Sequence, residues 1–84
     1  MEKVSDTIKD RDSSYGDYGK QSEIAEHLIG TMESIPDWGM LSADKKQSLR
    51  MIQVKIARLL NGDPNHVDSW HDIAGYAELA KERC

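Results

Sequence analysis

The sequence predicts an all-α protein, a small helical bundle built on an antiparallel helical hairpin near the C-terminus. Apolar residues recur at helical spacing over two long stretches, near 43–61 and 68–83. Gly62 and Pro64 separate these stretches, and this pair is typical of a helix end followed by a tight turn. Because the connection is short, the two helices are expected to pack antiparallel. The length of 84 residues, with 38% hydrophobic and 31% charged residues, predicts one soluble helical domain over 1–84.

The segment before the hairpin begins with a short predicted helix over residues 1–12, in which Val4 and Ile8 are one turn apart. Its ends are polar, so residues 1–13 are expected to fray and to be flexible. Residues 13–19 form a predicted loop that contains Tyr15 and Tyr18. These two rings either pack over the edge of the core or cover a ligand, since loops often carry function.

The first long helix is predicted over 20–34, with Ser22 as a candidate N-cap. One side of this helix is apolar and consists of Ile24, Ala25, Leu28, Met32 and Ile35. Glu23 and Glu26 have the spacing of a carboxylate pair that could hold a metal ion. They lie on the opposite side from the apolar residues, which favours a solvated surface.

The hairpin helices follow a loop over 36–41, in which Trp38 is the expected buried anchor. Ser42 is the predicted N-cap of the helix at 43–61, and Asp68 that of the helix at 68–83. The upstream helix has an apolar stripe of Leu49, Ile52, Ile56, Leu59 and Leu60. The downstream helix has a predicted core stripe of Trp70, Ile73, Ala74, Ala77 and Ala80.

A second side of the last helix carries Asp68, Asp72, Tyr76, Leu79 and Arg83. An ordinary solvated side would carry mainly Lys, Glu and Gln. One interpretation is structural: Asp68 caps the helix, Asp72 favours the helix dipole, and the tyrosine and leucine pack on the N-terminal segment. The other is that this side binds a ligand, a metal ion or another subunit.

Basic residues concentrate in one helix of an otherwise acidic chain. The net charge is −4, yet residues 42–62 contain one acid and five bases. Lys55 and Arg58 share one flank of this helix. They either neutralise acidic neighbours such as Asp72 or attract a phosphate-bearing ligand. The negative charge of the whole chain disfavours binding to long nucleic acid.

Met51 and Val54 also lie outside the apolar stripe of the basic helix. Together with Tyr76 and Leu79 they predict a contact surface, because a core this small should not need apolar residues on two sides of both helices. We therefore expect a homo-oligomer, with Met51, Val54 and Leu79 at the interface.

The remaining composition narrows the classes of protein further. Cys84 is the only cysteine, so no internal disulfide or cysteine-rich metal site is expected, and a reducing cytoplasm is the expected location. No apolar run approaches the roughly 18 residues needed to span a membrane. No Ser/His/Asp or Cys/His arrangement for nucleophilic catalysis is evident.

Three blocks of sequence resemble a family of small phage and prophage proteins of unknown function: residues 15–18, 55–64 and 68–77. Such an origin implies the cytoplasm of a bacterial host and a role in sequestering a nucleotide or blocking a host defence protein. More distantly, the chain is similar to all-α nucleotide pyrophosphohydrolases of the MazG type. Those enzymes hold magnesium with an E-x-x-E pair and an E-x-x-D pair. Glu23 and Glu26 match the first pair, whereas Asp68 and Asp72 are spaced by four residues rather than three.

Three functions remain open from the sequence. The first is a binding or inhibitory module without a cofactor and without turnover, in which Tyr15, Lys55, Arg58, Asp68, Asp72 and Tyr76 contact a nucleotide-type ligand or a host defence protein. The second is a magnesium-dependent nucleotide pyrophosphohydrolase that uses Glu23, Glu26, Asp68 and Asp72. The third is a passive structural subunit of a phage assembly.

Overall fold

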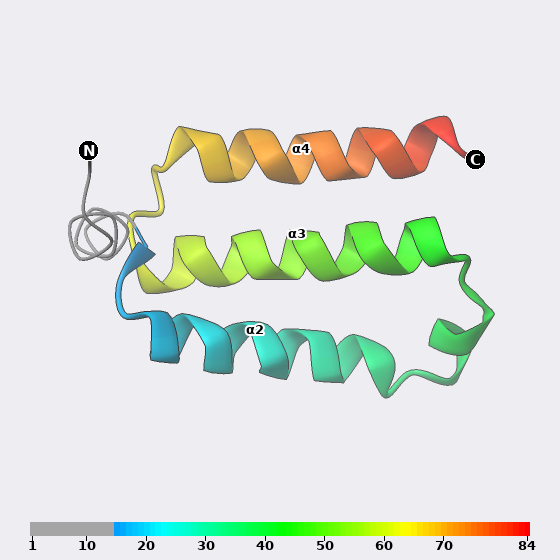
Figure 1. Ribbon diagram of the computed structural model, residues 1–84, viewed down its shortest axis with the longest axis horizontal. Helices are drawn as coiled ribbons and strands as arrows, with labels where there is room; N and C mark the ends of the chain where they lie inside the picture. The colour runs from blue at the N-terminus through cyan, green and yellow to red at the C-terminus, as the bar shows by residue number, and fades with distance from the viewer. Residues whose placement is uncertain (1–14) are drawn as a thin grey trace, which may run out of the picture.

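The computed structural model describes residues 15–84 and confirms the all-α prediction (Figure 1). These residues form helices α2 (Tyr18–Glu33), α3 (Ala43–Asn61) and α4 (Val67–Glu82), with a short 3-10 helix η1 (Pro36–Met40) between α2 and α3. The helix boundaries agree with the predicted ranges within two residues. The N-terminal helix predicted over 1–12 lies outside the described residues.

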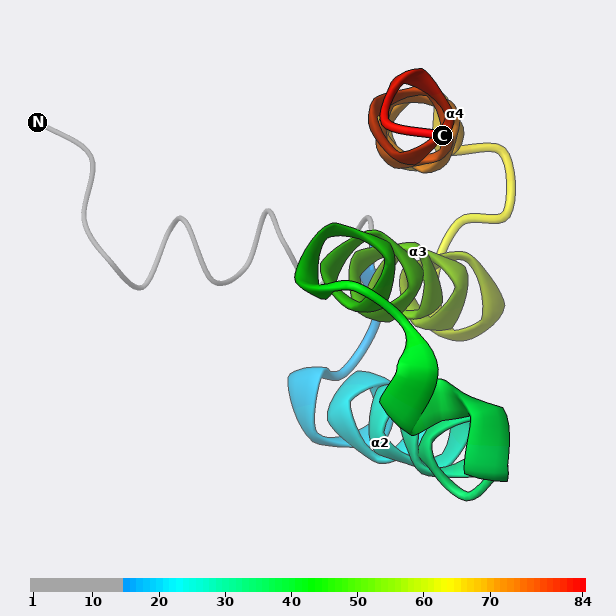
Figure 2. The same ribbon diagram turned by 90° about the vertical axis from the view of Figure 1, so that its right-hand side faces the viewer.

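The three α-helices lie side by side in one layer, with α3 in the middle. Figures 1 and 2 show α2 and α4 on opposite sides of α3, and each runs antiparallel to it. The predicted antiparallel hairpin is therefore the α3–α4 pair. α3 packs against both neighbours, and more extensively against α4. None of the helices in the described part of the chain is long and apolar enough to cross a membrane.

A side-chain cap explains the start of α2, and two of the predicted caps are wrong. The N-cap of α2 is Asp17, whose carboxylate accepts a hydrogen bond from the Lys20 backbone N–H at 3.0 Å. The predicted cap, Ser22, lies inside the helix and donates its hydroxyl to the Tyr18 carbonyl at 2.8 Å. His66 occupies the N-cap position of α4, which places Asp68 in the first turn rather than at the cap.

The start and end of α3 agree with the prediction in position and differ in detail. Ser42 is the N-cap residue, but its side chain makes no capping bond to the backbone. The helix ends at Asn61, and the Gly62 backbone N–H donates to the Arg58 carbonyl at 3.0 Å. Gly62 has a φ of −128°, so this glycine ends the helix without the left-handed conformation expected from its type.

Two ion pairs identify the sides of α3 that face its neighbours. The Lys55 ammonium lies 3.1 Å from the Asp72 carboxylate on α4, and the Arg50 guanidinium lies 3.1 Å from the Glu33 carboxylate on α2. At 100° per residue, Lys55 and Arg50 point in nearly opposite directions. Between the helices the core is thin: the apolar side chains buried within residues 15–84 are Ala25, Ala57 and Leu59.

The buried side of α4 is rotated about the helix axis, by part of a turn, from the core stripe predicted for it. Trp70 is 56% exposed, and Ala74 and Ala77 are also exposed. The least exposed side of the helix instead consists of Ser69, Asp72, Ile73, Tyr76 and Ala80. Two polar contacts account for this rotation. The Trp70 indole N–H donates to the Pro64 carbonyl in the interhelical turn at 2.8 Å, and Asp72 pairs with Lys55.

Trp38 was predicted to be a buried anchor and is half-buried. The guanidinium carbon of Arg50 lies 5.3 Å from the centroid of its ring. This distance is within the range of a cation–π contact. The indole therefore packs beneath a charged side chain of α3 rather than inside an apolar core.

Candidate functional site

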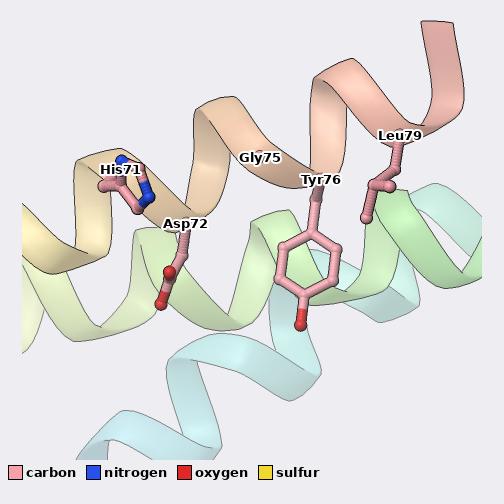
Figure 3. A pocket seen from close by; sticks show the side chains of 5 residues that line it. All are labelled: His71, Asp72, Gly75, Tyr76 and Leu79. Atoms are coloured by element: carbon pink, nitrogen blue, oxygen red, sulfur yellow. The ribbon is translucent and has the colours of Figure 1, made fainter. Parts of the chain in front are cut away.

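A hollow on the hairpin follows one side of α4. One part has a volume of about 270 Å³ and is lined by His71, Asp72, Gly75, Tyr76 and Leu79. A second part of about 340 Å³ shares Tyr76 and Leu79 and extends to Asp44, Gln47, Ser48, Glu82 and Arg83. In Figure 3, Asp72, Tyr76 and Leu79 extend from α4 across α3. We call these two parts together the α4 groove.

A nearly buried lysine neutralises the aspartate at one end of the α4 groove. Lys55 is only 9% exposed, and its ammonium lies 3.1 Å from the Asp72 carboxylate. An ammonium withdrawn from water requires a counter-charge, and Asp72 supplies it. The Asp72 side chain remains 43% exposed, so its carboxylate also faces the groove. Of the two interpretations that the sequence left open for Lys55, this ion pair agrees with the neutralisation of an acidic neighbour.

Asp44 holds the other end of the groove together. Its carboxylate lies 3.0 Å from the Lys45 ammonium and 3.4 Å from the Arg83 guanidinium, which connects the start of α3 with the end of α4. Hydrogen bonds from the Ser42 hydroxyl and from Lys45 lower the pKa of Asp44 well below its usual value. This carboxylate is therefore ionised throughout the neutral range, which suits its place in the first turn of α3.

A second cluster of polar and aromatic side chains lies where α3 ends and α4 begins. The guanidinium carbon of Arg58 is 4.7 Å from the centroid of the Tyr15 ring, and the His66 ring meets Tyr15 edge-on at 5.0 Å. His66 Nδ1 and the buried Ser69 hydroxyl share a hydrogen bond of 2.9 Å. Arg58 Nε is buried and has no hydrogen-bond partner among residues 15–84.

Asn61 fixes the chain that leads into α2. Its side-chain amide donates to the Tyr15 carbonyl at 3.0 Å and to the Asp17 carbonyl at 2.8 Å. Between these residues Gly16 has a φ of +77°, and a Cβ atom there would overlap the backbone carbonyl of Asn61. Only glycine combines that conformation with so close an approach. We call this arrangement the Gly16–Asn61 contact.

The predicted binding residues lie in two separate places, the α4 groove and the junction of α3 and α4. Tyr15 and Arg58 meet at the junction of α3 and α4. Asp72 and Tyr76 line the α4 groove, and Lys55 lies beneath it. Asp68 is exposed in the first turn of α4 and lines neither part of the groove.

The predicted interface residues lie on the groove side of the layer. Leu79 lines both parts of the groove and is 57% exposed. Met51 and Val54 are half-buried, and helical spacing places them on the same flank of α3 as Gln47, which lines the groove.

The carboxylates proposed for magnesium do not converge. Glu23 and Glu26 are exposed on α2, whereas Asp68 and Asp72 are on α4, and α3 lies between these two helices (Figure 1). Within the described part of the chain, no group of three or more His, Cys, Asp or Glu side chains is placed to hold a metal ion. Magnesium requires its ligands at about 2.0–2.1 Å from one point. The described residues therefore do not fit the metal site of a MazG-type enzyme.

Sequence reasoning missed several residues that shape these sites. Gly16 and Asn61 are far apart in the chain, and the only signal was a glycine between two tyrosines. Gln47 on α3 and His71 and Glu82 on α4 also line the α4 groove; the position of the two α4 residues follows from the rotation of α4, which periodicity alone does not determine.

Comparisons with known proteins identify the family to which the chain belongs. No match was found among curated proteins or among solved structures. One family model, described as "Domain of unknown function (DUF6378)", matches residues 1–84. The match covers the whole sequence, and the chain therefore belongs to this family of domains of unknown function.

Proposed function

We propose that this protein is a binding module that acts by occupancy: it covers a partner protein with its α4 groove and turns over no substrate. The observation that carries the proposal is the pairing of Lys55 with Asp72. The aspartate best placed in the groove already has a charged partner at 3.1 Å. A neutralised carboxylate is a poor magnesium ligand and a suitable component of a recognition surface.

The walls of the groove favour a protein over a nucleotide. Tyr76 and Leu79 supply an aromatic and an aliphatic surface, and aromatic residues are enriched at protein interfaces. Asp44, Asp72 and Glu82 surround them, and Arg83 already lies against Asp44. Lys55 and Arg83 are already paired with Asp72 and Asp44, so a phosphate group would have to compete with these carboxylates for its cations. An apolar segment that carries a lysine or arginine would meet complementary charge at Glu82.

The contact surface extends beyond the groove itself. Met51 and Val54 lie on the same flank of α3 as Gln47, so a segment seated on Tyr76 and Leu79 would reach them. The resemblance to small phage proteins supports an inhibitory role, in which the partner is a protein of the bacterial host.

Affinity capture with matched variants tests the partner. Leu79→Lys places a charge in the groove, whereas Met40→Lys places one on η1, where Met40 is 84% exposed and outside the groove. We expect at least one host protein whose recovery, measured by quantitative mass spectrometry, falls at least tenfold with Leu79→Lys and is unchanged with Met40→Lys. If every captured protein responds equally to both variants, the groove is not the binding surface.

Two further measurements separate this proposal from its alternatives. Native mass spectrometry of the purified protein should detect no bound nucleotide; a nucleotide mass would favour ligand sequestration instead. Incubation with magnesium and nucleoside triphosphates should release no pyrophosphate. If the wild type releases pyrophosphate and folded Asp72→Asn does not, the protein is an enzyme.

A further inference from the structure

One side of the central helix is apolar and faces neither neighbouring helix. Leu49, Ile56 and Leu60 are spaced by seven and four residues, so they share one side of α3. This side lies between the directions of Lys55, which faces α4, and Arg50, which faces α2. Gln47 and Met51 lie on the other free side, toward the α4 groove. Leu60 is 68% exposed.

The neighbouring helices extend this apolar side. On α4, Trp70 and Ala77 are on the flank away from Leu79 and the groove. Near η1, Met32 and Leu49 line a hollow of about 230 Å³ together with Ile35, Trp38, Leu41 and Asp37. We define the back face by six residues of the three helices: Met32, Leu49, Ile56, Leu60, Trp70 and Ala77. It lies on the opposite side of the layer from the α4 groove.

The layer of three helices is large enough for a stable dimer interface. Helices pack about 9 Å apart, so a layer of three is about 27 Å wide. A helix of 19 residues, the length of α3, is about 28 Å long. The outline of the whole layer is therefore about 750 Å², on the scale of the ~800 Å² that each partner buries in a standard interface. Stacking two such layers would also produce the two-layer arrangement typical of stable domains.

The charge of the back face favours a second copy over other occupants. None of its six residues is charged, and the charged neighbours that helical spacing places beside them, Lys45 and Lys81, lie one turn beyond Leu49 and Ala77, so the centre of two identical faces can meet without like-charge repulsion. The fourteen residues before Tyr15 contain only Met1, Val4 and Ile8 as apolar side chains. These are too few to cover a face that spans three helices.

We propose that a second copy of the chain docks on the back face, which gives a two-fold symmetric dimer of two helical layers. In such a dimer the same six residues of both copies meet. Trp70 is the expected anchor, since tryptophan is enriched among the residues that dominate interface energetics. The α4 groove of each copy remains on the outside. This inference does not depend on the proposed function of the groove.

The oligomeric state of the full chain and of two matched variants tests this proposal. Leu60→Lys and Leu79→Lys make the same substitution at exposed leucines on opposite sides of the layer. Neither should unfold the protein, which far-UV circular dichroism checks. In sedimentation equilibrium at tens of micromolar, the wild type and Leu79→Lys should be dimers. The dimer dissociation constant should rise at least tenfold in Leu60→Lys.

Two outcomes would overturn the proposal. A monomeric wild type at tens of micromolar would mean that no second copy covers the back face. A dimer lost in Leu79→Lys but retained in Leu60→Lys would place the second copy on the groove side, with Met51, Val54 and Leu79 at its interface.

Discussion

Replacing Gly16 by alanine should destabilise the protein strongly, because two independent costs meet at this position. Gly16 has a φ of +77°, where an L-residue costs about 1–2 kcal/mol. The added Cβ would also overlap the Asn61 carbonyl, which belongs to the backbone and cannot rotate away. Relieving such an overlap typically costs about 1–3 kcal/mol. The expected loss in the free energy of unfolding is therefore about 2–5 kcal/mol.

Gly30 provides the matched control for this substitution. It lies inside α2, and no atom outside its own helix would come within 4 Å of a Cβ there. Alanine is the better helix former by up to about 1 kcal/mol, so Gly30→Ala should stabilise the protein. The same chemical change is thus expected to have opposite signs at the two positions.

Thermal and urea unfolding, followed by circular dichroism, measure both effects. For a domain of this size, 1 kcal/mol corresponds to about 4–8 °C in Tm, so Gly16→Ala should lower Tm by at least about 8 °C. The reasoning fails if Gly16→Ala unfolds within about 0.5 kcal/mol of the wild type, the range of ordinary surface substitutions.

Three other perturbations have expected outcomes. Asn61→Ala removes the hydrogen bonds to the Tyr15 and Asp17 carbonyls and should lower the free energy of unfolding by about 1–3 kcal/mol in urea titrations; an unchanged midpoint would contradict this. Asp72→Asn leaves a nearly buried Lys55 opposite a neutral amide. The loss should be about 1–3 kcal/mol, below that of a fully buried pair because the Asp72 side chain is 43% exposed, and adding Lys55→Met should recover part of it. The lowered pKa of Asp44 predicts that the protein loses stability in acid. As the pH falls below about 4, the unfolded state binds a proton at Asp44 while the folded state does not, so the free energy of unfolding decreases as the pH decreases. Asp44→Asn should remove this part of the pH dependence of the free energy of unfolding.

The positions of the helices could be predicted because residues at their ends, such as glycine, proline and serine, favour the start or the end of a helix. Gly62 and Pro64 mark the end of α3 and the turn that follows, and Ser42 marks the start of α3. Such signals depend on only a few neighbouring residues, so they can be recognised in the sequence without knowledge of tertiary contacts. The shortness of the 62–66 connection was enough to predict an antiparallel hairpin.

The rotation of α4 about its own axis could not be predicted from the sequence, and the reason is physical. Its predicted core side and its mixed side are roughly opposite, and the buried side lies between them, with Ile73 from the first and Tyr76 from the second. Hydrophobic periodicity does not predict such an intermediate rotation. The choice depends on partners elsewhere: Pro64 accepts the Trp70 indole N–H, and Lys55 attracts Asp72. The mixed side predicted for α4 does line the α4 groove, through Asp72, Tyr76, Leu79 and Arg83, whereas His71 and Glu82 were not singled out by the sequence.

The central position of α3 determines which parts of the protein can open independently. α2 could detach while α3 and α4 remain paired, and α4 could detach while α2 and α3 remain paired. α3 can become free only when both neighbours have left it. Its middle amides, around Lys55, should therefore exchange their hydrogens with deuterated solvent most slowly, at a rate that reports global unfolding. Amides near the ends of α2 and α4 should exchange earlier, through partial openings that leave the rest of the layer intact.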